Sequence, residues 1–306
     1  MTMTSNNLNK IEGVWTALVT PFLQDLSIDW HSFDRLCDLQ AEAQVQGIVL
    51  SGTTGESPTL ENDEKIAMIT RARSRLPKTV RIMAGSGNSS TKQSIELSLR
   101  AVEAGADSLL VVTPPYNKPN FSGLKMHYES IASATKAPVC LYHVPGRTNQ
   151  RLSAEQIAEI TNIPGVSSVK EASADMILFS KSVLCCGRET SILSGDDFTY
   201  LPSIFIGAKG VISVISNIFP KAFVMMTKLA LSGQKEKALQ IHEALFDFTE
   251  WLFCETNPTP AKAALASLGF CENKLRLPLA PVSSENYQKI CESLKKAETQ
   301  LKNLNC

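Results

Sequence analysis

The chain is poor in the residues that build zinc centres and disulfide frameworks. Its 306 residues include four histidines and eight cysteines, and no two cysteines form a C-x-x-C pair. Because structural zinc sites usually need closely spaced cysteines and histidines, we expect no metal site. The adjacent Cys185 and Cys186 are expected to be reduced thiols, which indicates a reducing compartment such as the cytoplasm.

Signals for secretion, membrane insertion and nucleic-acid binding are also missing. The first ten residues, MTMTSNNLNK, are polar and lack the apolar core of a secretory signal, and no apolar run reaches membrane-spanning length. Thirty basic and thirty acidic residues give a formal net charge of zero. Nucleic acids and anionic membranes favour a basic excess in their partners, so we expect neither as a partner.

What the chain does contain is a set of eight short runs rich in valine, isoleucine and leucine, with helical patterns between them. Such runs are typical of parallel strands that are covered on both faces. Eight alternations of strand and helix predict a (β/α)8 barrel of the α/β class. A doubly wound open sheet would more often have fewer strands and a phosphate-binding glycine loop after the first, and no such loop is present. The predicted strands are residues 14–20, 47–52, 81–87, 107–113, 139–144, 166–172, 191–196 and 210–216.

Helical patterns fill the intervals and continue after the last strand. Residues 59–73, for example, have acids in the first turns and bases at the end, as the helix dipole favours. After about residue 233 the alternation stops and only helices are predicted, so we expect a barrel over residues 1–233 and a helical subdomain over residues 234–306. The other predicted helices are residues 29–44, 91–104, 123–135, 153–161, 175–185, 198–206, 219–231, 234–254, 259–268 and 284–303.

Lys170 lies near the end of the sixth predicted strand, in the stretch VSSVKEAS. Burial disfavours the ammonium form of a lysine, and the neutral amine can attack a ketone to form a Schiff base. The alternative is a strand-end lysine that extends its ammonium into solvent.

Polar residues and glycines gather at the ends of the other predicted strands, where (β/α)8 barrels hold their active sites. GTTGES, residues 52–57, offers hydroxyls and backbone N–H groups that can bind a carboxylate, although such turns also cap helices. Tyr142 can direct its hydroxyl into the barrel mouth, and Arg147 suits a carboxylate at the rim. The alternative for this pair is a core tyrosine and a solvated loop arginine. Because side chains alternate along a strand, His143 is expected to point away from Tyr142.

Six separated motifs, in this order, resemble the dihydrodipicolinate synthase family of class I pyruvate-dependent aldolases and lyases. The likeness runs from VWTALVTPF near the start to ETNPTPAKAAL at residues 255–265. It implies that the chain condenses pyruvate with aspartate 4-semialdehyde through a lysine Schiff base, with neither a metal nor a cofactor. The motifs are GTTGES, TPPYNKP, LYHVPGRT, SVKEAS, SGDD and GVISV.

The resemblance also implies roles for four catalytic residues. Lys170 would form the Schiff base with pyruvate. Tyr142 would relay protons to and from the adduct, joined in a hydrogen-bonded relay by Thr53 and Tyr116. In the family the residue equivalent to Tyr116 reaches across a dimer interface into the neighbouring site. We therefore expect a homo-oligomer, most simply a tetramer built as a dimer of dimers.

Four further residues would bind the substrates if the resemblance holds. Thr54 would hold the carboxylate of pyruvate, and Arg147 would bind the carboxylate of aspartate 4-semialdehyde. Gly195 and Ile212 would supply backbone carbonyls near the site.

Two alternatives and one regulatory expectation follow from the same comparison. N-acetylneuraminate lyases and keto-deoxy-sugar-acid aldolases share the lysine and tyrosine but generally lack an arginine after the Y-x-V-P-G turn, so Arg147 discriminates against them. A catalytically silent barrel is disfavoured because the catalytic set is intact. Where lysine-sensitive members place an acid and histidines, this chain has Gln93, Asn62 and Lys65, so we expect weak inhibition by lysine or none.

Overall fold

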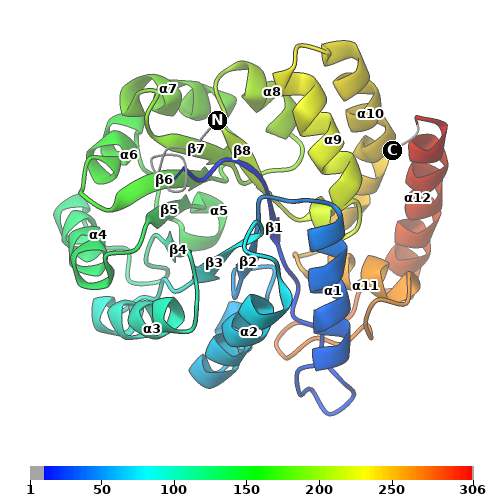
Figure 1. The fold of residues 1–306 in the computed structure, drawn as a ribbon, viewed down its shortest axis with the longest axis horizontal. Coiled ribbons are helices and arrows are strands. Elements are labelled where there is room, and N and C mark those ends of the chain that lie inside the picture. The colour runs from blue at the N-terminus through cyan, green and yellow to red at the C-terminus, as the bar shows by residue number, and fades with distance from the viewer. Residues whose placement is uncertain (1–9, 305–306) are drawn as a thin grey trace. The chain divides into compact units, whose positions relative to one another are not determined.

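Eight parallel strands form a closed barrel in chain order in the computed structural model, which describes residues 10–304 (Figure 1). Each strand overlaps one of the eight predicted ranges, and helices alternate with the strands. The predicted (β/α)8 barrel with C-terminal helices is thereby confirmed. The strands are β1 (Gly13–Ala17), β2 (Gly47–Leu50), β3 (Arg81–Gly85), β4 (Ser108–Val112), β5 (Val139–His143), β6 (Val166–Glu171), β7 (Ser191–Ser194) and β8 (Gly210–Ser213).

The described chain divides into two compact units. Unit 1 contains residues 10–13 and 84–211, and unit 2 contains residues 14–83 and 212–304. The boundary at residue 233, between a barrel and a helical subdomain, stays a prediction.

In unit 1 all helices except the single turn after β5 lie along the outer side of the strands (Figure 1). Most of them begin where a polar side chain accepts a hydrogen bond from a backbone N–H of the first turn. Asn120 accepts from the N–H of Gly123, and Ser153 forms a reciprocal capping box with Gln156. These helices are α3 (Thr91–Glu103), α4 (Phe121–Thr135), α5 (Pro145–Thr148), α6 (Ala154–Thr161), α7 (Met176–Cys186) and α8 (Tyr200–Phe205).

The register of β5 and β6 decides which side chains meet. Tyr142 is paired with Lys170, and His143 is paired with Glu171. Because side chains alternate along each strand, the first pair lies on one face of the sheet and the second pair on the other.

Unit 2 contains the C-terminal helices, of which α10 packs against α9, α11 and α12. No helix within residues 10–304 is both long and apolar enough to cross a membrane. The helices of this unit are α1 (Trp30–Glu42), α2 (Asn62–Arg75), α9 (Pro220–Leu231), α10 (Lys235–Leu252), α11 (Thr259–Ser267) and α12 (Ser284–Asn303), with short 3-10 helices η2 (Ser57–Thr59) and η3 (Ile215–Asn217).

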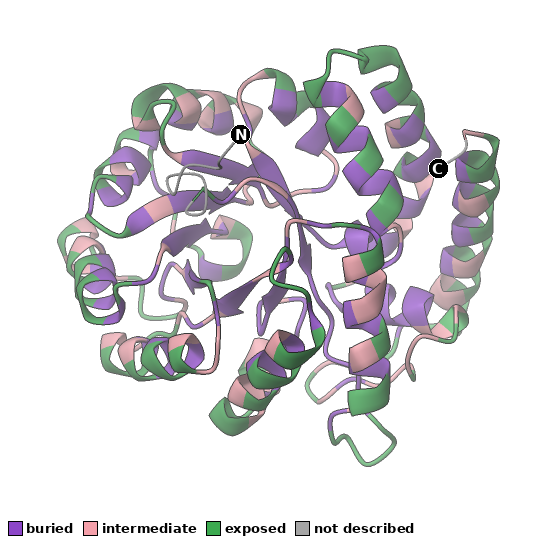
Figure 2. Ribbon diagram, viewed as in Figure 1, coloured by how far each residue is buried: buried purple, intermediate pink, exposed green. Residues whose placement is uncertain are grey.

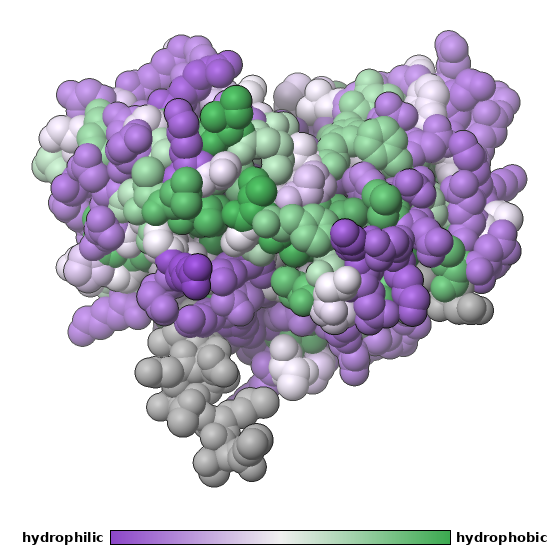
Figure 3. All heavy atoms as spheres, turned by 90° about the horizontal axis from the view of Figure 1, so that it is seen from above, coloured by the Kyte–Doolittle hydropathy of each residue, from purple (hydrophilic) through white to green (hydrophobic). Residues whose placement is uncertain are grey.

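The strands are almost wholly buried, whereas each outer helix buries one side and exposes the other (Figure 2). All residues of β5, β7 and β8 are buried, as expected for parallel strands covered on both faces. Some large apolar side chains remain in solvent, among them Ile177, Leu184 and Phe205 in unit 1. Figure 3 shows hydrophobic residues on the surface between hydrophilic ones.

Candidate active site

Lys170 and Tyr142 face each other on neighbouring strands of unit 1. Lys170 is 6% exposed, and its Nζ lies 4.3 Å from the centroid of the Tyr142 ring. Two positions earlier, Cys140 is paired with Ser168. Burial raises the pKa of the Cys140 thiol to about 11, so this cysteine stays protonated and does not compete as a nucleophile at neutral pH. A buried amine beside a phenol combines a nucleophile with a group that can donate or accept a proton.

Gly195 directly follows β7 and leaves the space that the Lys170 side chain occupies. A Cβ added at this position would lie 2.8 Å from Lys170 Cε and 2.6 Å from Ala172 Cβ, closer than side chains can approach. Its backbone N–H donates to the Glu171 carbonyl at 2.6 Å, which holds the turn against β6. The backbone carbonyl role of Gly195 stays a prediction, and the structure adds a steric reason for a glycine here.

On the opposite face of β5 and β6 a second polar pair is buried. His143 Nδ1 lies 3.1 Å from Glu171 Oε1, and both side chains are almost completely removed from solvent. His143 therefore points away from Tyr142, as predicted. Sequence reasoning missed Glu171, although a glutamate inside an apolar strand and next to a lysine is an unusual signal.

Arg147 lies in α5, a single helical turn that begins right after β5. Its side chain is exposed, while the segment around it is anchored at several points. Thr148 Oγ1 accepts a hydrogen bond from Thr113 Oγ1 at 3.2 Å, and Gln150 Nε2 donates to the Pro119 carbonyl at 2.8 Å. A guanidinium on an anchored turn can bind a carboxylate without first ordering a flexible loop.

Tyr116 projects from the loop after β4 and is 95% exposed. Its φ of +72° is in the left-handed region, which is strained for a tyrosine. The loop is held by Asn117 Nδ2, which donates to the Ser89 carbonyl at 2.8 Å, and by Ser89 Oγ, which donates to the Pro115 carbonyl at 2.8 Å. The structure brings Lys170, Tyr142 and Gly195 together, but it leaves Tyr116 in solvent.

The predicted residues Thr53, Thr54 and Ile212 belong to unit 2. Thr54 is buried, and Asn257 Nδ2 donates to its Oγ1 at 3.0 Å. Since Oγ1 serves as acceptor in that bond, its own O–H stays available as a donor. Thr53 is half-buried in the same turn, and its carbonyl accepts from the Glu56 N–H. Ile212 is buried in β8.

Glu56 anchors the GTTGES turn through a buried ion pair. Sequence reasoning missed this pair. Lys262 Nζ, on α11, lies 2.6 Å from Glu56 Oε1, and both side chains are fully buried. The Arg276 backbone N–H donates to Glu56 Oε2 at 3.0 Å. Burial lowers the pKa of Lys262, and the Glu56 carboxylate opposes that shift. A single lysine inside the otherwise apolar helix motif TPAKAAL is the sequence signal that could have pointed to this pair.

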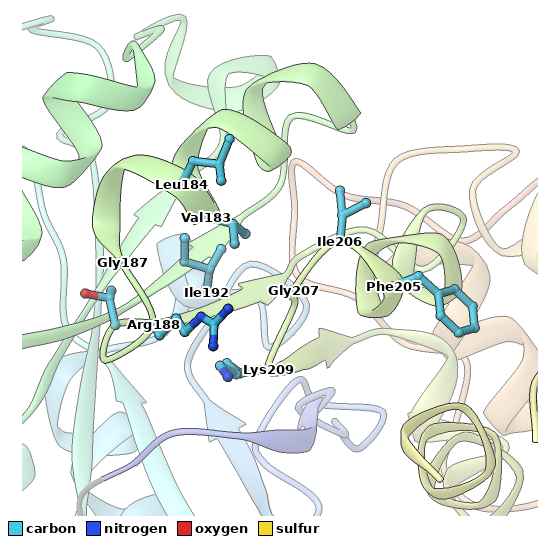
Figure 4. Close-up of a pocket in the computed structure, with 10 residues that line it drawn as sticks. Val183, Leu184, Gly187, Arg188, Ile192, Phe205, Ile206, Gly207 and Lys209 are labelled. Carbon is cyan, nitrogen blue, oxygen red and sulfur yellow. The ribbon is translucent and has the colours of Figure 1, made fainter. Parts of the chain in front are cut away.

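A cavity of about 560 Å³ lies elsewhere in unit 1 (Figure 4). It is lined by Thr190 and Ile192 at the start of β7, by Lys209 just before β8, and by residues at the ends of α7 and α8. Active sites of (β/α)8 barrels lie at the carboxyl ends of the strands, so this cavity does not mark the site of reaction. Within residues 10–304, no group of three histidine, cysteine, aspartate or glutamate side chains is placed to bind a metal ion.

Comparisons with known proteins agree with this geometry. Residues 10–297 match the model of the dihydrodipicolinate synthetase family. The chain is similar to the 4-hydroxy-tetrahydrodipicolinate synthase of Leptospira biflexa, with 41% identity over 93% of this chain and 98% of the relative. It is also similar to the synthase of the same name from Magnetococcus marinus, with 39% identity over 93% of this chain and 97% of the relative. Among solved structures, the 4-hydroxy-tetrahydrodipicolinate synthase of Methylacidiphilum fumariolicum SolV superposes with a TM-score of 0.94 and 37% identity, covering 97% of this chain and 99% of that one.

Proposed function

This chain belongs to the dihydrodipicolinate synthetase family, and we propose that it catalyses the reaction for which its relatives are named. It condenses pyruvate with L-aspartate 4-semialdehyde to 4-hydroxy-tetrahydrodipicolinate, a step of lysine and diaminopimelate biosynthesis. The observation that carries this proposal is the buried Lys170 beside Tyr142, within a chain whose relatives share one name. The alternatives, a sialic-acid lyase or a sugar-acid aldolase, are not favoured by those names.

The first half of the reaction uses Lys170 as nucleophile. Its neutral amine forms a C–N bond to C2 of pyruvate, and the carbonyl oxygen leaves as water. The resulting protonated imine withdraws electrons, so the pyruvate methyl group loses a proton and becomes an enamine. Tyr142, whose ring lies 4.3 Å from Nζ, is the group proposed to carry protons to and from the adduct.

The second half joins the two substrates. The enamine carbon attacks the aldehyde carbon of the semialdehyde, and the aldehyde oxygen takes up a proton. The amino group of the second substrate then attacks the imine carbon, closes the ring and expels Lys170. Arg147 is proposed to hold the carboxylate of that substrate.

The remaining assignments are part of the same proposal. Thr54 would bind the pyruvate carboxylate, Thr53 would extend the proton relay, and Ile212 and Gly195 would present carbonyls. Tyr116 is proposed to complete the relay of a neighbouring subunit, which its 95% exposure in a single chain supports. A homotetramer, a cytoplasmic location and weak inhibition by lysine stay predictions.

Trapping the imine tests the assignment of Lys170. Borohydride added with pyruvate should reduce the imine and leave a pyruvyl-derived mass on the peptide that contains Lys170. Lys262 is the matched control inside the same protein, because it is also buried but is ion-paired. A label on Lys262, or no label at all, would contradict the mechanism.

A second assay separates the proposed reaction from the alternatives. The enzyme is incubated with pyruvate and aspartate 4-semialdehyde, and in parallel with N-acetylneuraminate or a keto-deoxy-sugar acid. Turnover of the first pair alone supports the synthase. Cleavage of a sugar acid without condensation would place the chain among the aldolases instead.

A further inference from the structure

His143 is buried on the outer face of β5 between two hydrogen-bond partners from different segments. The Leu152 backbone N–H donates to His143 Nε2 at 3.2 Å, and His143 Nδ1 lies 3.1 Å from Glu171 Oε1. Since Nε2 accepts a hydrogen bond, it carries no proton, and in the neutral ring the proton is then on Nδ1. The imidazole thus donates to Glu171 and accepts from Leu152.

The partner Leu152 ends the segment that carries Arg147. This segment runs from residue 145 to residue 152, and three of the hydrogen bonds that hold it link it to residues at least nine positions away in the chain. Thr148 is bonded to Thr113, Gln150 is bonded to the Pro119 carbonyl, and Leu152 is bonded to His143. Of these three, only the bond to His143 connects the segment, through Glu171, to the strand that carries Lys170.

The partner Glu171 is next to Lys170 in the chain and is 2% exposed. Its Oε1 accepts from the Ser173 N–H at 2.9 Å and faces His143 Nδ1, and its backbone carbonyl accepts from Gly195. A buried carboxylate that loses a donor is strongly destabilised, so removal of the imidazole would disturb the end of β6.

We propose that His143 is a positioning residue for the second substrate: through Leu152 it holds the Arg147 segment at a set distance from the strand of Lys170. The imidazole touches neither substrate, because it lies on the face of the sheet opposite Tyr142 and Lys170. This inference rests on the proposed function, in which Arg147 binds the semialdehyde carboxylate. The bond to Leu152 governs affinity for that substrate, and the bond to Glu171 governs the stability of β6.

Two substitutions separate these bonds. In His143→Asn the side-chain amide nitrogen takes the place of Nδ1 and donates to Glu171, but no atom reaches Leu152. In His143→Gln the longer amide oxygen takes the place of Nε2 and accepts from Leu152. We expect His143→Asn to raise the KM for aspartate 4-semialdehyde about tenfold, the effect of one lost hydrogen bond, while the rate of pyruvate imine trapping stays at the parent value. His143→Gln should restore the parent KM, although it should lower the free energy of unfolding because Glu171 loses its donor.

His127 offers a matched control in the same unit. It is also a buried histidine, with Nδ1 2.9 Å from Thr91 Oγ1, and none of its hydrogen bonds involves residues 145–152. Burial lowers the pKa of His127 to about 4, so this imidazole is neutral at the pH of the assay. His127→Asn should leave the KM for the semialdehyde unchanged.

Hydrogen exchange provides a readout that does not depend on turnover. The Leu152 amide should exchange faster in His143→Asn than in the parent enzyme and in His143→Gln. An unchanged KM and unchanged Leu152 exchange in folded His143→Asn would overturn the inference, as would an equal rise of KM in His127→Asn. A failure of the proposed function is distinguishable, because the parent enzyme itself would then form no product from the semialdehyde.

Discussion

Single residues that take no part in the proposed chemistry shape the surroundings of Lys170. Gly195 leaves the space through which the lysine side chain passes, and Cys140 stays a protonated thiol because it is buried. Tyr142 is the only predicted catalytic partner of Lys170 for which residues 10–304 show direct contact with it. Two substitutions test this arrangement, one at Gly195 and one at Arg147.

Gly195→Ala is expected to slow imine formation between about tenfold and a hundredfold, because the added methyl group displaces Lys170 Cε, and a displacement near 1 Å can cost that much. The measurement is the rate of borohydride trapping with pyruvate. Gly146→Ala is the control, since a Cβ there meets no atom within 4 Å. Equal trapping rates in the two variants would contradict the steric role of Gly195.

Arg147→Ala is expected to weaken use of aspartate 4-semialdehyde by about 2 kcal/mol or more, because a carboxylate loses its charged partner. Imine formation with pyruvate should survive. Steady-state kinetics in both substrates measure the two effects. Arg151→Ala removes a second exposed arginine from the same segment, residues 145–152, and it should keep the parent kinetics. Similar losses in both variants would show that the positive charge of this segment matters in general, and not the specific position of Arg147.

Sequence periodicity was sufficient to predict the relative orientation of two neighbouring side chains on β5. Alternation placed His143 opposite Tyr142, and the structure confirms it. Which side chains pair across neighbouring strands could not be predicted, because pairing depends on the register of the two strands. A shift of one residue would move every side chain to the other face. Glu171 therefore had no predicted partner, although its neighbour Lys170 was singled out.

At the scale of elements, the eight strands could be predicted from the sequence, whereas the short helical turns η2 and α5 could not. All eight strands overlap their predicted ranges because their apolar runs are distinct. The helix predicted to begin at residue 59 is instead divided into η2 and α2, since Glu61 and Glu64 form a capping box that starts α2 at Asn62. The turn α5 was missed because four residues hold barely one helical period.

The GTTGES turn depends on α11 through the pair Glu56–Lys262, whose members are 206 positions apart. Lys262→Met should lower the free energy of unfolding by about 3–5 kcal/mol, because the Glu56 carboxylate would be buried without its cation. The double variant Glu56→Gln/Lys262→Met should recover much of that loss. Urea unfolding of the two single variants and the double variant measures the coupling.

The exposed pair Lys289–Glu292 is the matched control for this cycle. Its side chains are about half exposed, so Lys289→Met should cost less than about 1 kcal/mol. Equal losses in Lys262→Met and Lys289→Met would show that burial does not strengthen the Glu56–Lys262 pair.

At the scale of the whole molecule, a single chain leaves Tyr116 in solvent with strained backbone geometry. Strain of this kind costs on the order of 1–3 kcal/mol and persists where a function requires it. Contacts between copies could not be derived from periodicity or composition, because neither describes how two surfaces fit. The tetramer therefore rests on the family resemblance and on the exposure of this tyrosine.

Turnover is expected to require association of chains. Sedimentation velocity combined with activity measurements across a dilution series should show activity falling as the oligomer dissociates. Tyr116→Phe should lower turnover in the intact oligomer, because the relay loses a hydroxyl group while the apolar ring is kept. A fully active monomer would contradict the role of Tyr116.

The space at Gly195 also has a genetic consequence. Every missense change at this codon adds a Cβ, and that atom would lie 2.8 Å from Lys170 Cε whichever amino acid it belongs to. A second mutation at Ala172 could remove one of the two clashes but not the clash with the lysine. Substitutions at position 195 are thus expected to be selected against for as long as residue 170 is a lysine. In a library of all single variants selected for growth without lysine and diaminopimelate, every residue other than glycine should be depleted at this position.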